Sequence, residues 1–217
     1  SGIREQTNDL RFITTDLRLV PDDISIFDAF YTQSPINHLN HKNHVFLLPT
    51  FLFYKCHVNH FFKTEKIYFG GGMRNRQKDF LEYIYRPNVL FKAKILLKGF
   101  ESDNRVNHSE HLRLLQNSKY SITIADVDYN DNGFITTRHF ENIINGVISF
   151  VDSKYDKYEI MVKKDDWRRV SSFIEMLEKI ECLEKNIFEY NKIFQKQKEE
   201  IKEEYLNGQY YYNQLIQ

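Results

Sequence analysis

From residue 66 to residue 151, short apolar segments alternate with stretches in which apolar residues recur at helical spacing, and this alternation restricts the fold more than any other feature. The strand-like segments lie at 66–69, 93–97, 120–125 and 147–151, and the helical stretches at 74–85, 110–116 and 136–145. Crossovers through helices return each strand in the same direction, so such a chain forms a parallel sheet. The sequence therefore predicts an α/β domain with helices on both faces of a parallel sheet.

The regions on either side of this domain are organised differently. Residues 10–15 read as a buried strand that ends at Asp16, and 46–48 is a second strand-like segment before a proline. Residues 55–66 are polar and lose any regular period, which indicates a domain junction there. After residue 165 the apolar residues recur every three or four positions, which predicts helices to the end of the chain.

A glycine run at 70–72 follows the first of these strands and opens a helix. Glycines let backbone amides approach an anion, and a helix N-terminus adds partial positive charge. Arg74 and Lys78 are four residues apart, so they share one helix face near that end. These features suit a diphosphate, although the run is neither a Walker A loop nor a full GxGxxG. A tight turn followed by a solvated basic face is the alternative interpretation.

A second pair of charged residues, Arg138 and Glu141, begins the helix predicted at 136–145. At this spacing both side chains lie on one helix face. An arginine can neutralise a phosphate, and a glutamate can accept two hydrogen bonds from a ribose diol. A simple intrahelical ion pair is the commoner meaning of this spacing. The position after strand 120–125 favours a ligand site, because ligands bind at the carboxyl ends of strands in such sheets.

Two further patterns resemble metal-binding sequences without completing them. Residues 128–135 match the first eight positions of an EF-hand loop, but His139 stands where the loop needs glutamate, and the preceding segment is strand-like. The second pattern consists of His38, His41 and His44, followed by Cys56, His57 and His60, and its His-x-x-His-x-x-His spacing lacks a matched second pair of ligands. We therefore expect no metal site at either place.

Asp16 stands where the strand at 10–15 ends. A carboxylate in that position can act as a general base. It can equally cap the turn that follows, and the residues alone favour the cap.

Composition excludes several classes of protein. The chain has 217 residues, of which 41% are hydrophobic, and its formal net charge is zero, whereas a protein that coats nucleic acid is usually basic. Its two cysteines lie far apart in sequence, which indicates a reducing compartment rather than a disulfide framework. We see neither a signal peptide nor an apolar run of about 18 residues, so we expect a soluble, cytoplasmic protein without membrane contact.

Three segments together resemble the DNA β-glucosyltransferases of T-even phages. The strongest lies around 128–141, within a longer likeness over 126–156; the segments 68–78 and 15–19 resemble the diphosphate loop and the segment that supplies the catalytic base. The resemblance implies the GT-B fold, in which two Rossmann-like domains enclose a cleft. It also implies transfer of glucose, with inversion, from UDP-glucose to 5-hydroxymethylcytosine in duplex DNA.

The resemblance assigns roles to individual residues. The glycines would offer backbone amides to phosphate, the basic side chains would bind the diphosphate, the glutamate would bind ribose, and a tyrosine would line the donor site. The residues implied for the UDP-sugar are Gly71, Gly72, Arg74, Lys78, Tyr129, Arg138 and Glu141, and the catalytic base is Asp16. Two of these depart from the family, because Lys78 replaces an arginine and Gly72 a hydroxyl residue.

The resemblance also divides the chain. Residues 1–62 would form an incomplete, acceptor-side Rossmann-like domain, 63–195 the Rossmann-like UDP-sugar-binding domain, and 196–217 a C-terminal helix that crosses back to the first domain. Several strands that the family has before the segment resembling 11–16 have no counterpart here. We therefore expect a missing N-terminal segment, a second chain that completes the first domain, or a loss of catalysis.

The leading hypothesis is a UDP-sugar-dependent glycosyltransferase that acts on modified double-stranded DNA in the cytoplasm of an infected host cell. A divalent ion, Mg²⁺ or Mn²⁺, would assist product release, and the sequence identifies no ligands for it. A glycosyltransferase with a different acceptor is one alternative. A non-catalytic nucleotide-sugar-binding or interaction protein is the other.

Overall fold

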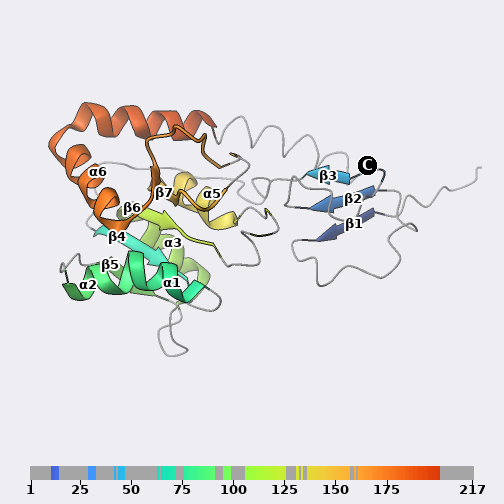
Figure 1. Cartoon of the computed structure of the whole chain (residues 1–217), viewed down its shortest axis with the longest axis horizontal. Coiled ribbons are helices and arrows are strands. Elements are labelled where there is room, and N and C mark those ends of the chain that lie inside the picture. The colour runs from blue at the N-terminus through green and yellow to red at the C-terminus, as the bar shows by residue number, and fades with distance from the viewer. Residues whose placement is uncertain are drawn as a thin grey trace, which may run out of the picture.

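The computed structural model describes most of the region from residue 63 to residue 200 and three short strands nearer the N-terminus (Figure 1). The described positions are 11–14, 29–32, 42, 44–46, 63, 65–71, 76–90, 95–98, 106–125, 131, 133, 136–156, 159 and 161–200.

The larger sheet has five strands in the order β5-β4-β6-β7-β8, and every neighbouring pair is parallel. Its strands are β4 (Glu65–Gly70), β5 (Ile95–Lys98), β6 (Ser118–Thr123), β7 (Ile148–Asp152) and β8 (Arg169–Val170). The predicted parallel sheet is confirmed, and the four strands predicted within it begin and end within two residues of the predicted positions. The short edge strand β8 was not predicted.

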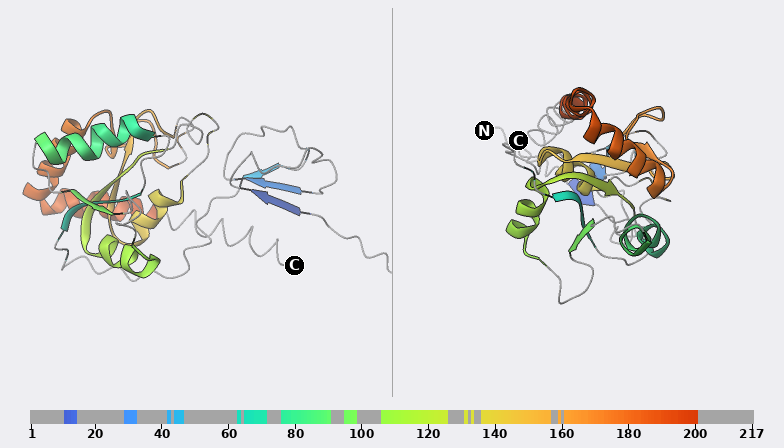
Figure 2. Two further views of the ribbon diagram at one scale, coloured as in Figure 1. Left: turned by 90° about the horizontal axis from the view of Figure 1, so that it is seen from below. Right: turned by 90° about the vertical axis from the view of Figure 1, so that its left-hand side faces the viewer.

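Helices cover both faces of this sheet, as the sequence predicted. They are α1 (Gln77–Phe80), the π-helical segment η4 (Leu81–Tyr85), α2 (Arg86–Leu90), α3 (His108–Gln116), α5 (Thr137–Ile144), α6 (Phe173–Lys185) and a further helix over 187–200. The helices of 77–90, α6 and 187–200 pack on one face, and α3 and α5 on the other, as the right-hand view of Figure 2 shows.

The helix between β4 and β5 runs without a break from Gln77 to Leu90, although it contains Pro87. A proline within a helix has no N–H to donate and crowds the carbonyl four residues before it. The wider π turn lies directly before the proline, and the Arg86 N–H bonds to the Leu81 carbonyl five residues back. The π segment thus accommodates the proline, and the helix continues five residues beyond its predicted end.

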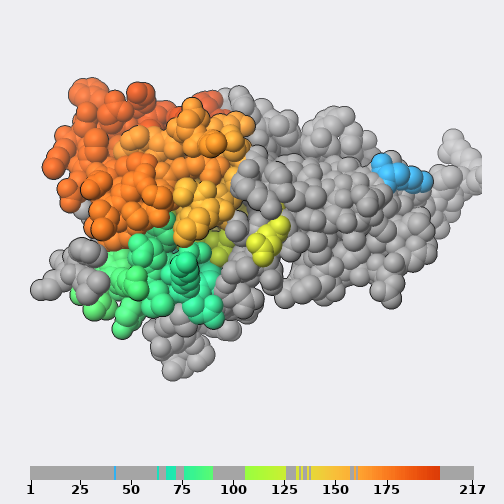
Figure 3. All heavy atoms as spheres, viewed as in Figure 1, coloured from blue at the N-terminus to red at the C-terminus, as the bar shows by residue number. Residues whose placement is uncertain are grey.

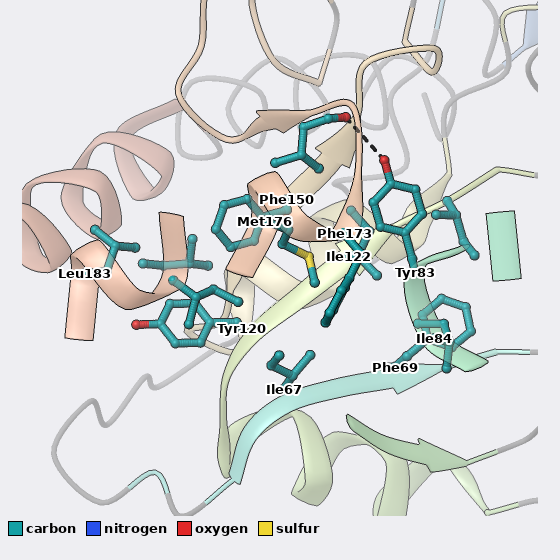
Figure 4. Packing of buried hydrophobic residues seen from close by; sticks show 14 of the residues in the cluster. Ile67, Phe69, Tyr83, Ile84, Tyr120, Ile122, Phe150, Phe173, Met176 and Leu183 are labelled. Carbon is teal, nitrogen blue, oxygen red and sulfur yellow. Dashed lines mark hydrogen bonds between the residues drawn. The ribbon is translucent and has the colours of Figure 1, made fainter. Parts of the chain in front are cut away.

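The larger hydrophobic core lies between the sheet and the helices of 77–90, α6 and 187–200, and Figure 4 shows its packing. Side chains alternate along β4, so Ile67 and Phe69 enter this core and Tyr68 lies on the other face. The Tyr83 hydroxyl donates to the Val170 carbonyl at 3.4 Å, which ties the helix to edge strand β8. Figure 3 shows the helix of 77–90 and α6 side by side on the outer surface.

The opposite face combines a small apolar cluster with a buried polar one. Tyr68, Leu114, Leu115 and Val147 form the apolar cluster beneath α3. The polar cluster lies beneath α5, where the Ser149 hydroxyl is 3.1 Å from three side-chain atoms: Thr123 Oγ1, His139 Nδ1 and Asn142 Nδ2. Helix α5 is therefore held on the sheet partly by directional hydrogen bonds.

Both ends of α5 lie where the sequence predicted. The Thr136 hydroxyl accepts a hydrogen bond from the Arg138 amide at 3.3 Å and so caps the first turn. At the other end, Gly146 has a φ of 75°, and its amide and that of Val147 bond to the carbonyls of Ile143 and Asn142. This is a Schellman motif, for which glycine is the favoured residue.

The helix over 187–200 is joined to the sheet through Gln197, which is fully buried. The Gln197 amide donates to the Val147 carbonyl at 2.9 Å and accepts from the Ser149 amide at 3.3 Å. Strand β8 pairs only with the last two residues of β7, so Gln197 bonds the edge that β8 leaves open. The helix thus remains in contact with β7 through residue 197, and the boundary between 195 and 196 stays a prediction.

The smaller sheet has three parallel strands in the order β1-β2-β3. They are β1 (Arg11–Thr14), β2 (Ala29–Thr32) and β3 (His44–Phe46). Strand β1 confirms the predicted strand at 10–15, β3 overlaps the segment at 46–48, and β2 was not predicted. The domain division at residue 62 stays a prediction. None of the helices in the described ranges is both long and apolar enough to cross a bilayer.

Candidate functional site

The carboxyl ends of β4 and β6 adjoin the point where the order of strands reverses. From β4 the chain passes to β5 on one side and then crosses to β6 on the other. The two connecting helices, 77–90 and α3, lie on opposite faces of the sheet. In open α/β sheets, ligands bind in the crevice at such a reversal. The segments that carry the predicted donor residues follow these strands.

Gly70, the last residue of β4, is closely surrounded. A Cβ there would lie 2.6 Å from His111 Cε1 and 2.7 Å from Tyr68 Oη, which is closer than real Cβ atoms approach. At Gly71 a Cβ would lie 3.2 Å from the ring of Phe69, which is tight but less severe. A side chain at Gly70 would therefore displace His111 or Tyr68, whereas at Gly71 the Phe69 ring would need to give by only a few tenths of an ångström.

Arg76 bridges the ends of β4 and β6 from the start of its helix. Its NH1 donates to the Ile124 carbonyl at 2.9 Å, and its guanidinium carbon lies 5.9 Å from the centre of the Phe69 ring. Its NH2 lies 3.4 Å from the position that a Cβ on Gly71 would take. Arg76 was not among the predicted basic residues, Arg74 and Lys78, yet its guanidinium brings positive charge beside the glycines.

Arg138 and Glu141 lie together near the start of α5. Arg138 NH1 donates to Glu141 Oε2 at 2.7 Å, so the pair forms the intrahelical ion pair that the spacing allowed. The Glu141 side chain is 13% exposed and that of Arg138 is 37% exposed. Part of the Arg138 side chain is thus exposed, whereas Glu141 is largely covered.

His111, in the first half of α3, connects this pair to β4. Its Nδ1 lies 2.7 Å from the Tyr68 hydroxyl, its Nε2 contacts Arg138 NH1, and its Nε2 lies 3.6 Å from Glu141 Oε2. The imidazole is nearly buried, with 10% of its side chain exposed. Tyr68, His111, Arg138 and Glu141 thus form one cluster, here called the α3–α5 cluster, beside Gly70.

The charges in the α3–α5 cluster stabilise one another. Burial opposes ionisation of Glu141, but a hydrogen bond from His111, when Nε2 carries a proton, and the positive charge of Arg138 outweigh it and lower the pKa of Glu141. Burial raises the pKa of Tyr68 to about 12, so its hydroxyl stays protonated at neutral pH. The cluster therefore presents a carboxylate and a guanidinium at this edge, with the buried phenol of Tyr68 behind His111.

Four predicted site residues fall in the described part of the chain, and the other four do not. Gly71, Arg138 and Glu141 lie as described above, and Lys78 is exposed as the second residue of α1. Outside the described residues lie Asp16, Gly72, Arg74 and Tyr129. Their roles stay predictions.

Tyr68 and His111 were not anticipated as site residues. The sequence pattern predicts only a strand at Tyr68 and a short helix at His111. A capping signal could have drawn attention to His111: Asn107 caps α3 by accepting from the Glu110 amide at 2.8 Å. This puts His111 in the first turns of a helix, at the carboxyl edge of the sheet.

Within the described ranges, no group of three or more His, Cys, Asp or Glu side chains is arranged to hold a metal ion. The strand β6 precedes the segment that resembles an EF-hand loop, where an EF-hand would have a helix.

Comparison with known proteins identifies the fold that contains this site. No family profile matches the sequence, and no curated protein matches it. A solved structure of T4 phage β-glucosyltransferase, however, superposes with a TM-score of 0.70 at 14% identity, over 94% of this chain and 73% of that one. The chain has the fold of phage β-glucosyltransferase.

Two further structures of T4 phage β-glucosyltransferase agree. One, in complex with UDP and Mn²⁺, gives a TM-score of 0.69 at 13% identity, over 95% of this chain and 73% of that one. A mutant in complex with UDP-glucose gives 0.67 at 14% identity, over 86% and 61%. The resemblance inferred from the sequence, with its GT-B-type α/β architecture, is thus confirmed as a likeness of fold.

Proposed function

We propose that the chain is a glycosyltransferase that moves a sugar, glucose by the family resemblance, from a UDP-sugar to a hydroxymethylated base in double-stranded DNA. The observation that carries the proposal is the α3–α5 cluster beside Gly70 and Gly71, in the fold of phage β-glucosyltransferase. A guanidinium and a carboxylate side by side match the two unlike parts of a nucleoside diphosphate, its phosphates and its ribose diol.

On the donor side, the Arg138 guanidinium binds a phosphate, and Glu141 accepts hydrogen bonds from the ribose hydroxyls. The low pKa of Glu141 keeps it ionised, so it remains an acceptor at neutral pH. The backbone amide of Gly71 faces the diphosphate. Lys78 adds positive charge from the neighbouring helix. Gly72, Arg74 and Tyr129 complete the donor site in this proposal.

On the acceptor side, Asp16 acts as the general base. It takes the proton of the acceptor's primary alcohol while the alcohol oxygen attacks the anomeric carbon of the sugar. The bond from that carbon to the diphosphate breaks, and its electron pair leaves with UDP. Attack from the side opposite the leaving group inverts the anomeric centre. Arg138 and the other basic residues stabilise the charge that develops on the departing diphosphate.

A divalent cation is part of one related structure, which contains UDP and Mn²⁺. The described residues of this chain do not form a group of three ligands for such an ion.

Calorimetry with UDP-glucose tests the donor site. A charge-assisted hydrogen bond contributes about 1.5–3 kcal/mol, so Arg138→Ala should weaken binding at least about tenfold. Arg113→Ala is the matched control, because Arg113 forms an exposed ion pair of the same spacing with Glu110 on the neighbouring helix. Equal affinity of the Arg138 variant and the wild type would refute the assignment.

Incubation with hydroxymethylated duplex DNA and UDP-glucose, read by mass spectrometry of the digested nucleosides, tests the acceptor. A glucosylated nucleoside supports the proposal. UDP-glucose binding without transfer to DNA would favour a different acceptor or a non-catalytic nucleotide-sugar-binding protein, and transfer to another acceptor would decide between these two.

A further inference from the structure

Two charged groups, Arg138 and Glu141, meet at one nitrogen of the α3–α5 cluster. His111 Nε2 contacts the Arg138 guanidinium and lies 3.6 Å from Glu141 Oε2, while Arg138 NH1 is itself 2.7 Å from the same carboxylate oxygen. A guanidinium offers only N–H donors. The Arg138 contact therefore requires that Nε2 carry a lone pair and no proton.

This requirement fixes the tautomer of His111. With Nε2 unprotonated, a neutral imidazole carries its proton on Nδ1 and donates it to the Tyr68 hydroxyl, 2.7 Å away. The ring has little freedom to turn away, because it is nearly buried and is packed against Gly70. Nε2 therefore keeps facing Arg138 and Glu141.

If Arg138 moves outward to bind a phosphate, the Nε2 lone pair faces the Glu141 carboxylate with no hydrogen between them. Two acceptors about this far apart in a nearly buried site repel each other. A proton on Nε2 removes the repulsion and turns the pair into an imidazolium–carboxylate ion pair. Arg138 and a proton are thus alternative partners of the same two atoms.

We propose that His111 is a positioning residue of the donor site, where it takes up a proton in exchange for Arg138 when a nucleoside diphosphate draws the guanidinium away. The exchange rests on the proposed function for its ligand, but the competition between Arg138 and the proton does not. The protonated His111 keeps Glu141 fixed and ionised for the ribose after Arg138 has moved away.

The neighbouring charged groups are compatible with this exchange. Tyr68 faces His111 from β4 and stays protonated, since burial raises its pKa to about 12. Arg138 and Glu141 face it from α5. Two further ionisable residues lie on α3, the helix that carries His111. Glu110 acts through its charge on the pKa of Tyr68, and His108 acts in the same way on the pKa of Glu141. Within the described residues, Arg138 and Glu141 are therefore the charges that contact Nε2.

Nitrogen NMR of the imidazole groups measures the exchange directly. The chain has eight histidines, and His111→Gln identifies the signal of His111 by its loss. In Arg138→Gln, which removes the competing cation, we expect the titration midpoint of His111 to rise by about one pH unit or more relative to the wild type. Arg113→Gln removes the same charge from the exposed face of α3 and should leave the midpoint where it is.

Addition of UDP-glucose to the wild type should raise the midpoint in the same direction. UDP-glucose has no terminal phosphate group that titrates near pH 6, so the proton uptake can be assigned to the protein. In Glu141→Gln the rise on binding should be lost, because no carboxylate remains to hold the proton. Melting curves of each variant would confirm that the fold is retained.

The outcomes separate the two proposals. An unchanged midpoint in Arg138→Gln overturns the exchange, whether or not UDP-glucose binds. A raised midpoint in Arg138→Gln together with no response to UDP-glucose supports the competition for Nε2 and counts against the donor site itself. A rise on UDP-glucose binding that persists in Glu141→Gln overturns the role given to the carboxylate.

Discussion

Replacement of Gly70 by alanine should damage the donor site through His111 rather than through the backbone. The described glycines with positive φ are Gly133 and Gly146, so Gly70 has a conformation that alanine can adopt. The added methyl group, however, would lie 2.6 Å from Cε1 and 2.8 Å from Nδ1 of His111, and 2.7 Å from the Tyr68 hydroxyl. To reach an ordinary contact of 3.4 Å, the imidazole must move by about 0.8 Å.

The structure gives two magnitudes for this change. Overpacking a buried site typically costs about 1–3 kcal/mol, so Gly70→Ala should lower the free energy of unfolding by about that amount. A displacement of His111 also removes the ion pair through which it holds Glu141 when a nucleoside diphosphate is bound. The loss of one charge-assisted contact, about 1.5–3 kcal/mol, corresponds to UDP-glucose binding that is weaker by about 10-fold to 150-fold.

A double-mutant cycle tests whether His111 and Tyr68 carry the effect. Urea unfolding would be measured for Gly70→Ala in the wild type and in a His111→Ala, Tyr68→Phe background, where the crowded atoms are gone. In that background the cost of Gly70→Ala in unfolding free energy should fall to near zero, because the steric clash is gone. Any small remaining cost is offset because alanine restricts the unfolded chain more than glycine does. An equal cost in both backgrounds would show that the backbone at Gly70 matters and that the steric argument is wrong.

Two further predictions concern pH and catalysis. Burial, followed by the charge of Arg168, lowers the pKa of His139 to about 3. Below pH 6.5 the unfolded chain therefore binds a proton at this residue that the folded chain does not bind. The contribution of His139 to the free energy of unfolding should be fully present above pH 6.5 and should be lower by about 2 kcal/mol at pH 5. His139→Gln should flatten this slope in urea unfolding at pH 7 and pH 5, and an identical slope in both proteins would refute the cause. Asp16→Asn should lower turnover by about 10²–10⁴-fold at unchanged UDP-glucose affinity; a joint fall of both would make Asp16 a structural cap.

The sequence predicted the elements that its local pattern determines. The core strands β4, β6 and β7 are short segments rich in aromatic and β-branched residues, and the ends of α5 follow from a threonine cap and a glycine with positive φ. Strand β8 was missed because it has two residues, and only its pairing with the end of β7 makes it a strand. The contact of Gln197 with β7 could not be predicted either, since nothing near this residue in sequence reveals the open edge of β7.

The residues of the candidate site also include some that the sequence reveals and some that only the folded chain brings together. Arg138 and Glu141 could be found from their spacing on one helix and their position after a strand. His111 could not, because its role depends on α3 and α5 packing side by side, a contact between residues about thirty positions apart in sequence. Arg76 was missed for the same reason, since its partner is a carbonyl at the end of β6.

The inner face of α5 explains how Arg138 and Glu141 are held in a fixed direction. His139 and Asn142 directly follow Arg138 and Glu141 in sequence, and both bond to the Ser149 hydroxyl of β7. Successive residues of a helix are about 100° apart, so the inward pair and the outward pair have the same spacing on adjacent faces. An apolar inner face would let α5 turn or slide by fractions of an ångström, because hydrophobic contacts are not directional. The hydrogen bonds of His139 and Asn142 to the Ser149 hydroxyl instead fix the rotation of α5 on the sheet. They thereby fix the direction in which the guanidinium and the carboxylate meet a ligand.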